Sequence, residues 1–237
     1  MASVPSLDPG SVQVWRLEAG SARLDQCTPL LDQPERERAA RFGLPEQQRE
    51  FIVTRAWLRR LLGAYLGTAP SGIRLDYGPQ GKPRLADPAS TSLEFNVAHS
   101  GGSALLAFTT DGPIGVDIER PGRDLEVDDL VPTLFTPRER HQLARLEPGL
   151  RRTGFFRLWT GKEAYLKAIG RGASLPRQDF TVELADPGVI TSVKPTDPGL
   201  PRLGVQWLSL PTGLVGAVCR GAPPWRLAIL DPIATLA

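Results

Sequence analysis

Two acidic residues lie two positions apart near the middle of the chain, in the segment 115–119 (Gly-Val-Asp-Ile-Glu). In a strand, residues i and i+2 point to the same face, about 6.6 Å apart, so Asp117 and Glu119 would share one face. Val116 and Ile118 would then enter the core. At an effective dielectric of ~20, the two carboxylates repel each other by about 2.5 kcal/mol. Mg²⁺ removes such repulsion and prefers oxygen ligands, with phosphate oxygens completing its shell. The pair indicates a magnesium site or, alternatively, two ordinary acids on a solvent-exposed edge strand.

A long helix is expected at about residues 153–169, where apolar residues recur at helical spacing before a glycine-rich stop. Glu163 and Lys167 lie one turn apart at the edge of its apolar stripe, either as catalytic groups or as an ordinary i,i+4 ion pair. Lys162 projects into the stripe itself. It therefore needs a buried anionic partner, unless its ammonium group reaches solvent along the helix surface. The stripe consists of Phe155, Leu158, Trp159, Leu166 and Ile169.

Two turns and a group of arginines could bind anions. A predicted strand runs into a turn that carries His99, one of only two histidines, followed by Ser100 and two glycines. The backbone N–H groups of such a turn, with the imidazole, could hold a phosphate, although a histidine beside glycine is also common in ordinary turns. Lys82 lies in a rigid Gly-Lys-Pro turn. The arginines form either an anion-binding surface or the solvated face of two helices; they are Arg36, Arg38, Arg41, Arg49, Arg55, Arg59 and Arg60.

The composition is that of a folded globular protein. Of the 237 residues, 41% are apolar and 23% are charged, which is enough apolar material for a core. Two cysteines make no disulfide framework, no apolar run approaches the roughly 18 residues of a membrane span, and the first residues lack a signal-peptide pattern. We therefore expect a cytoplasmic protein with no membrane partner. The net charge of +2 is too small to imply nucleic acid by itself.

The expected elements follow the same order in each half of the chain, which predicts an α+β fold of two similar subdomains packed face to face. The predicted boundary lies at Gly112-Pro113, giving subdomains 1–112 and 113–237. The first half has a strand at 12–17, helices at 34–38 and 46–66, and strands at 73–77, 93–98 and 104–109. The second half has a strand at 114–119, the helix at 153–169, and strands at 180–184, 205–210, 214–219 and 226–230.

Four motifs occur in a fixed order: Gly-Lys-Pro at 81–83, Phe-Asn-Val-Ala-His-Ser at 95–100, Ile-Gly-Val-Asp-Ile-Glu at 114–119, and Phe-Phe-Arg-Leu-Trp-Thr-Gly-Lys-Glu-Ala-Tyr-Leu-Lys-Ala-Ile-Gly-Arg-Gly at 155–172. Their order resembles the 4′-phosphopantetheinyl transferase superfamily, most closely its longer, monomeric branch that activates the surfactin synthetase. The resemblance implies two α+β subdomains related by a pseudo-twofold, with the active site in the cleft between them. It also implies transfer of the phosphopantetheine arm of coenzyme A to a serine of an acyl or peptidyl carrier protein, with release of 3′,5′-ADP.

The resemblance further implies roles for individual residues. Asp117, Glu119 and Glu163 match the acids that bind Mg²⁺, for which Mn²⁺ could substitute, and Glu163 is our choice of general base. Lys167 matches the lysine at the diphosphate, and His99 matches the group at the 3′-phosphate. The family's phosphate-binding positions also fall on Lys82, Pro83, Ala98 and Ser100. The chain departs from the family at Ala98, often serine, and at Glu50, where a family arginine reaches the 3′-phosphate; Arg38 or Arg49 is the candidate replacement.

Two other functions are compatible with part of the sequence. An arginine-rich nucleic-acid-binding protein would account for the arginines, but three acids would repel a phosphate backbone in the absence of metal. A relative that binds carrier proteins without catalysis would not need the acids and Lys167, which this chain retains. The sequence does not identify the carrier protein, because carriers of several pathways present a similar acidic helix to a basic groove.

Overall fold

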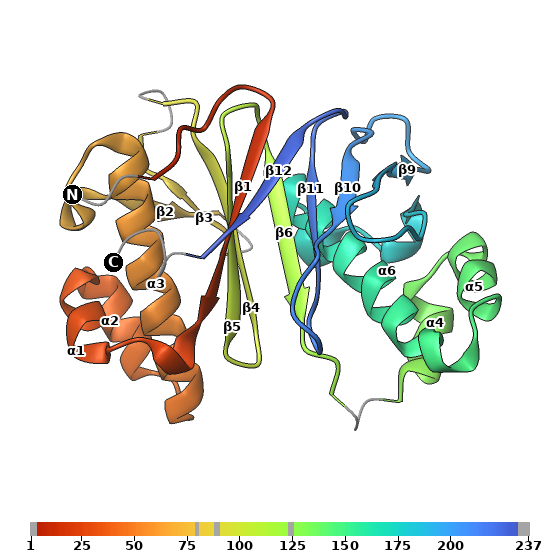
Figure 1. The fold of residues 1–237 in the computed structure, drawn as a ribbon, viewed down its shortest axis with the longest axis horizontal. Coiled ribbons are helices and arrows are strands. Elements are labelled where there is room, and N and C mark those ends of the chain that lie inside the picture. The colour runs from red at the N-terminus through yellow and green to blue at the C-terminus, as the bar shows by residue number, and fades with distance from the viewer. Residues whose placement is uncertain (1–3, 79–80, 88–90, 123–125, 232–237) are drawn as a thin grey trace.

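The computed structural model describes residues 4–78, 81–87, 91–122 and 126–231. Two four-stranded sheets face each other at the centre, and a long helix covers the outer face of each (Figure 1). The first sheet has the order β12-β1-β5-β4 and the second β6-β11-β10-β8. The covering helices are α3 (Pro45–Leu66) and α6 (Pro148–Ala168). The strands are β1 (Ser11–Glu18), β4 (Glu94–Ser100), β5 (Ser103–Thr109), β6 (Ile114–Glu119), β8 (Ile190–Ser192), β10 (Gly204–Trp207), β11 (Val215–Arg220) and β12 (Arg226–Leu230).

Alternation along the strands explains this layering. On β5, Leu106 and Phe108 belong to the core beneath α3, while Leu105 and Ala107 belong to the core between the two sheets. A strand buried on both faces reads as a continuous apolar run, as the sequence of β5 does. The same core between the sheets takes Val116 from β6. The expected α+β fold with two halves is therefore confirmed.

Shorter elements flank the layers. In the first half these are α1 (Leu24–Cys27), α2 (Gln33–Ala40), β2 (Leu75–Tyr77) and β3 (Pro83–Leu85). In the second half they are α4 (Val127–Leu134), α5 (Pro137–Ala144), β7 (Phe180–Thr181) and β9 (Lys194–Pro195). The sequence predicted neither α4 nor α5, and the strand predicted at 180–184 is limited to β7. α4 contains Pro132, which argues against a helix there, and α5 buries only Glu139 and Leu143, so it lacks the repeated apolar spacing from which a helix is predicted.

Each half contains its own buried ion pair of the same kind, and the sequence analysis missed this repeat. Asp32 and Glu35 form a capping box at the start of α2, and Thr136 and Glu139 form the equivalent box at the start of α5. Each buried glutamate then pairs with a cation of the following long helix. Glu35 Oε2 lies 2.6 Å from Nε of Arg59 on α3, and the second pair joins Glu139 to α6. The spacing Asp/Thr-x-x-Glu before a long helix was the available signal for this repeat.

The last strand lies in an unexpected place. Residues 226–230 were predicted to belong with the second half, but β12 pairs in parallel with β1, with Ser11 opposite Arg226. That prediction was wrong, because pairing between residues about 215 positions apart leaves no local sequence pattern. The boundary at residues 112–113 stays a prediction. None of the helices in the described ranges is long and apolar enough to cross a membrane.

Candidate active site

The acid pair lies on β6, on the face that α6 covers. Asp117 is buried, with 6% of its surface exposed, whereas Val116 and Ile118 point the other way, into the core between the sheets. The predicted division of the strand into two faces is therefore confirmed. The alternative of two acids on a solvent-exposed edge strand is wrong for Asp117, because α6 packs across this face.

Asp117 is only partly satisfied by its neighbours. Its Oδ1 lies 2.7 Å from the Lys167 Nζ, while its Oδ2 is buried and accepts no hydrogen bond from any residue that the structure describes. Burial raises the pKa of Asp117 to about 6, although the attraction of Lys167 opposes this effect; Glu119 and Glu163 raise the pKa further. A buried carboxylate with one unpartnered oxygen is suited to an incoming cation.

Glu119 accepts hydrogen bonds from both halves of the molecule. Its Oε1 accepts from the indole Nε1 of Trp159, at 3.2 Å, and its Oε2 accepts from the Ser100 hydroxyl, at 2.9 Å. Ser100 ends β4 of the first sheet, so the candidate site spans the boundary between the sheets. Trp159 is only half-buried. Its ring packs against the core cluster that contains Phe155 and Leu158, as its place in the apolar stripe of α6 predicted, while the indole N–H reaches the acid group.

Glu163 and Lys167 share α6 but do not pair with each other in the structure. Glu163 Oε1 accepts from Nε and Nη2 of Arg177, both at 2.6 Å, whereas Lys167 binds Asp117 and also donates to the Val116 carbonyl at 3.2 Å. The alternative of an i,i+4 ion pair is therefore wrong. The Arg177 guanidinium also stacks over the Trp159 ring at 4.9 Å. Arg177 lies in a segment without periodicity, so no sequence signal pointed to it.

Lys162 is fully buried and has the anionic partner that burial requires. Its Nζ lies 2.8 Å from Glu139 Oε1, and both side chains are 0% exposed. The ammonium also donates to the carbonyls of Arg177 and Phe180, at 2.7 and 2.6 Å. The alternative of an ammonium that reaches solvent is wrong. Lys162 ties the segment that carries Arg177 to α6, and thereby helps to place the partner of Glu163.

Several of the predicted coenzyme A residues line one pocket of about 150 Å³. The side chain of His99 is 52% exposed, and its Nδ1 lies 3.2 Å from Glu50 Oε2. Glu50 Oε1 accepts the backbone N–H of Gly102 at 2.9 Å, so this N–H of the turn already has a partner. The lining residues are Arg38, Phe51, Thr54, Arg55, Leu58, Gly81, Pro83, Val97 and His99. Arg38, Pro83 and His99 are thus brought together, as the sequence predicted.

Other predicted coenzyme A residues lie elsewhere. The Lys82 ammonium donates to the carbonyls of Ile114 and Lys167, at 3.0 and 2.9 Å, and burial lowers its pKa. Lys82 thus joins the β2–β3 hairpin to β6 and α6. Arg49 donates to the carbonyl of Ala19 at 3.0 Å and to two further carbonyls, outside this pocket. Ala98 is buried between the sheets, which leaves only its backbone for a ligand.

The arginine group does not form one exposed basic surface. Arg59 is 1% exposed and pairs with Asp32 and Glu35 in the core of the first half. Arg36 donates to the Leu31 carbonyl, as Arg49 does to its three carbonyls. The interpretation of these residues as a solvated helix face is therefore wrong for Arg59. The main support for a nucleic-acid-binding function is removed by these internal contacts.

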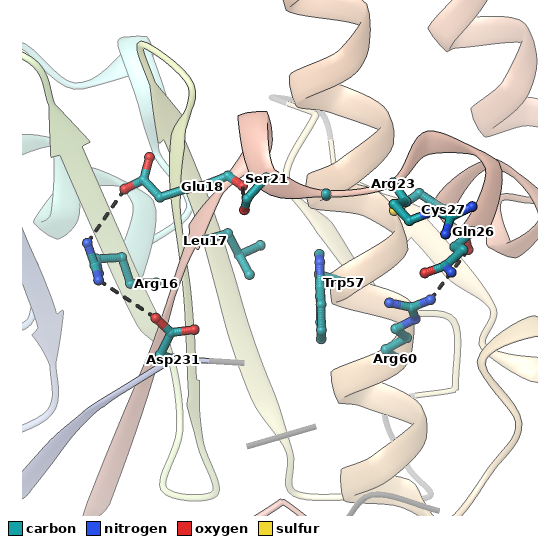
Figure 2. Close-up of a pocket in the computed structure, with 11 residues that line it drawn as sticks. Arg16, Leu17, Glu18, Ser21, Arg23, Gln26, Cys27, Trp57, Arg60 and Asp231 are labelled. Carbon is teal, nitrogen blue, oxygen red and sulfur yellow. Dashed lines mark hydrogen bonds and ion pairs between the residues drawn. The ribbon is translucent and has the colours of Figure 1, made fainter. Parts of the chain in front are cut away.

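A second pocket, of about 350 Å³, is lined by residues of β1, α1 and α3. Figure 2 shows Trp57 at its centre, with Arg60 stacked over the indole at 4.9 Å. Arg16 lies on the opposite side, 3.6 Å from Glu18 and 3.8 Å from Asp231. None of the candidate catalytic or coenzyme A residues lines this pocket, so it is separate from the site built on β6 and α6.

Comparison with known proteins assigns the family. The model described as "4'-phosphopantetheinyl transferase, N-terminal" matches residues 15–111, and that of the 4'-phosphopantetheinyl transferase superfamily matches residues 113–214. The 4'-phosphopantetheinyl transferase HetI of a Nostoc species is 38% identical over 201 residues, which span 83% of this chain and 80% of that protein. The chain belongs to the 4′-phosphopantetheinyl transferase superfamily.

This transferase is also similar to relatives of the two-domain type. The 4'-phosphopantetheinyl transferase Sfp of Bacillus subtilis is 28% identical over 189 residues, spanning 80% of this chain and 81% of that protein. A further 4'-phosphopantetheinyl transferase of Bacillus subtilis is 31% identical over 169 residues, or 70% of this chain and 72% of that protein. The resemblance found in the four motifs is thereby confirmed. The transferase catalyses 4′-phosphopantetheinyl transfer to carrier proteins, with coenzyme A as the donor.

Proposed function

We propose that the transferase binds Mg²⁺ on Asp117, Glu119 and Glu163 and uses Glu163 and Lys167 in the transfer step. The observation that supports this most is the buried Asp117 Oδ2, which has no hydrogen-bond donor among the described residues. Carboxylate oxygens are the donors that Mg²⁺ prefers, so the chemistry of the three side chains fits the ion. Within the described ranges, no three acidic, histidine or cysteine residues are close enough to hold a metal as they stand. To bind the ion together with Asp117 and Glu119, Glu163 would first have to break its ion pair with Arg177.

In this proposal, two side chains of α6 act in the transfer step: Glu163 accepts a proton and Lys167 stabilises negative charge. Glu163 takes the proton of the carrier's serine hydroxyl, and the serine oxygen then attacks the phosphorus that bears the pantetheine arm. A new P–O bond to serine forms, the bond between the attacked phosphorus and the bridging oxygen of the diphosphate breaks, and 3′,5′-ADP leaves with that oxygen. Lys167, next to Asp117, attracts the negative charge that develops on the diphosphate oxygens. When Mg²⁺ is bound, it supplies additional positive charge to the same oxygens.

The pocket beside β4 is our candidate for the 3′-phosphate of coenzyme A. Two of its lining residues, Arg38 and His99, are cationic or become so on protonation, and both were predicted to contact coenzyme A. Glu50 holds the Nδ1 side of His99, so the other ring nitrogen, Nε2, is available to a phosphate oxygen. In this proposal the backbone at Ala98 and Ser100 and the turn at Pro83 border the cofactor, whereas Lys82 and Arg49 support the surrounding fold.

The finer parts of the function rest on the same reasoning. We propose that residues 1–112 supply the coenzyme A phosphate pocket and residues 113–237 the metal site and the catalytic helix. The partners would be acyl or peptidyl carrier proteins, and the enzyme would act as a cytoplasmic monomer. The hydrogen bond from Ser100 to Glu119 supports a monomer, because a single chain supplies residues on both sides of the site.

Mass spectrometry tests the proposal directly. Several purified apo carrier proteins are incubated with the enzyme, coenzyme A and Mg²⁺, or with EDTA in place of Mg²⁺. We expect at least one carrier to gain a single phosphopantetheine mass on serine, only when the metal is present. Equal transfer in EDTA by protein freed of metal would contradict the magnesium assignment. The relative rates for the carriers would also rank them as substrates.

A further inference from the structure

The third candidate magnesium ligand, Glu163, is held by an arginine and not by the two acids with which it would bind the ion. Glu163 Oε1 accepts from Nε and Nη2 of Arg177, both at 2.6 Å. Within the described ranges, no three acidic, histidine or cysteine residues lie close enough together to hold a metal. Arg177 therefore supplies the positive charge that Glu163 would otherwise obtain from the ion.

The backbone of Arg177 is anchored independently of its side chain. Its carbonyl accepts a hydrogen bond of 2.7 Å from the Lys162 ammonium, which also donates to the Phe180 carbonyl at 2.6 Å. Lys162 itself pairs with Glu139 at 2.8 Å, and both of these side chains are fully buried. The segment from Arg177 to Phe180 is thereby fastened to α6, the helix that also carries Glu163.

The side chain of Arg177 is placed by Trp159. The guanidinium carbon lies 4.9 Å from the centroid of the Trp159 ring, and the indole Nε1 donates to Glu119 Oε1 at 3.2 Å. One indole therefore contacts a candidate metal ligand through its N–H and the arginine through its face. The side chains of Arg177 and Glu163 are 23% and 17% exposed, so solvent and salt screen their attraction less than that of a surface pair.

We propose that Arg177 competes with Mg²⁺ for Glu163 and so sets the metal concentration at which the site fills. This inference rests on the proposed function, in which Glu163 binds Mg²⁺ together with Asp117 and Glu119. Binding of the ion by all three acids requires the pair of Arg177 and Glu163 to break. The apparent affinity for the ion is then lowered by the small fraction of molecules in which Glu163 is free. Arg177 is a positioning residue in this role, because it acts on the ion only through Glu163.

Replacement of Arg177 by methionine removes the cation and retains the packing. Methionine is of similar reach and makes favourable contacts with aromatic rings, so it can remain on Trp159. The carbonyl of residue 177 still accepts from Lys162. We therefore expect Arg177→Met to unfold cooperatively on heating. If it does not, Arg177→Gln, which is also neutral, takes its place with the same expected results.

The test is a titration of the metal-free protein with Mn²⁺, in the absence of coenzyme A. Mn²⁺ accepts the same oxygen ligands as Mg²⁺, and its EPR signal reports the free concentration. We expect Arg177→Met to bind Mn²⁺ about tenfold more tightly than the unsubstituted protein, the scale of one hydrogen-bonded contact between charged groups. An unchanged or weaker affinity would overturn the inference. Damage to the fold would weaken binding, so it cannot imitate the expected gain.

A matched control distinguishes competition from a general change in net charge. Arg157, also on α6, pairs at 3.5 Å with Asp186, whose side chain is 89% exposed. Arg157→Met removes the same charge, but it frees none of the candidate metal ligands. We expect its affinity for Mn²⁺ to change by less than about twofold. A gain as large as that of Arg177→Met would assign the effect to net charge and overturn the inference.

Glu163→Gln distinguishes failure of this inference from failure of the proposed function. It should weaken Mn²⁺ binding, and adding Arg177→Met to it should give no gain, because the carboxylate for which the two cations compete is absent. If Glu163→Gln weakens binding and Arg177→Met alone does not strengthen it, Glu163 remains a ligand and only the role of Arg177 is overturned. If Glu163→Gln leaves binding unchanged, the assignment of Glu163 to the metal is overturned together with the inference.

Discussion

Lys167 on α6 and Asp117 on β6 form an ion pair of 2.7 Å at the centre of the candidate site. The sequence-based prediction placed Lys167 at the diphosphate and Asp117 at the metal, and it did not address a contact between them. In this structure each of the two side chains partly neutralises the charge of the other. A ligand that binds here must compete with this pair or join it.

Replacement of Asp117 should separate catalysis from folding. We expect Asp117→Ala to lose transfer by more than ~10²-fold, the scale of losing one preorganised charged group, while thermal unfolding stays cooperative. Calorimetric titration with Mg²⁺ in the presence of coenzyme A should show weakened metal binding. Full activity at ordinary Mg²⁺ concentrations would contradict the metal assignment. Loss of cooperative unfolding would mark Asp117 as structural.

The raised pKa of Asp117 predicts a pH dependence of stability in the metal-free protein. The folded state binds this proton up to about pH 6, whereas the unfolded state releases it near pH 4. The folded state holds more protons between these values, so the free energy of unfolding should decrease as the pH rises from about 4 to about 6. The contribution is on the order of 3 kcal/mol. Urea unfolding in EDTA at several pH values should show a smaller decrease in Asp117→Asn; an equal decrease would assign the effect to other groups.

Glu163 and Lys167 should respond differently to substitution, because they pair with different groups. Glu163→Gln keeps the shape but loses the charge, and we expect it to need more Mg²⁺ for half-maximal rate. Lys167→Ala should lower the rate by ~10²-fold or more without raising the Mg²⁺ requirement, since it removes a cation from Asp117. Rates measured against Mg²⁺ concentration decide this. Lys194→Ala, which removes an exposed partner of Glu183, is the control. If the Glu163 and Lys167 variants behave alike, the general base must be sought elsewhere.

The buried pair of Lys162 and Glu139 should be a determinant of stability. Lys162→Met leaves the Glu139 carboxylate buried without its cation, which costs about 3–5 kcal/mol in the free energy of unfolding. The double variant with Glu139→Gln should recover part of this loss. Urea unfolding measures both variants. Lys194→Met, at an exposed ion pair, should change stability by less than about 1 kcal/mol. A similarly small effect at Lys162 would contradict the structural role.

Lys82 offers a test between a structural and a phosphate-binding role. Its ammonium donates to the carbonyls of Ile114 and Lys167. We therefore expect Lys82→Met to lower the free energy of unfolding by about 1–3 kcal/mol, the cost of unsatisfied buried polar groups. Its affinities for coenzyme A and 3′-dephospho-coenzyme A should change by the same factor. A selective loss of coenzyme A affinity would instead indicate that Lys82 binds the 3′-phosphate.

The sequence by itself determined the family, the main strands and helices, and the faces of β6. These follow from local patterns, since alternation sets Asp117 and Glu119 against Val116 and Ile118, and the four motifs carry their own order. The capping boxes of α2 and α5 were also readable, as Asp/Thr-x-x-Glu, although they were missed.

Only the tertiary structure decided which charges meet. Lys82 binds the carbonyl of Lys167, 85 positions away, and Ser100 binds Glu119 across two sheets. Arg177 pairs with Glu163, and β12 joins β1. In each case the partner is chosen by how the sheets and helices pack, because a hydrogen bond or ion pair depends on the distance between atoms. Charge type and local spacing do not contain that distance.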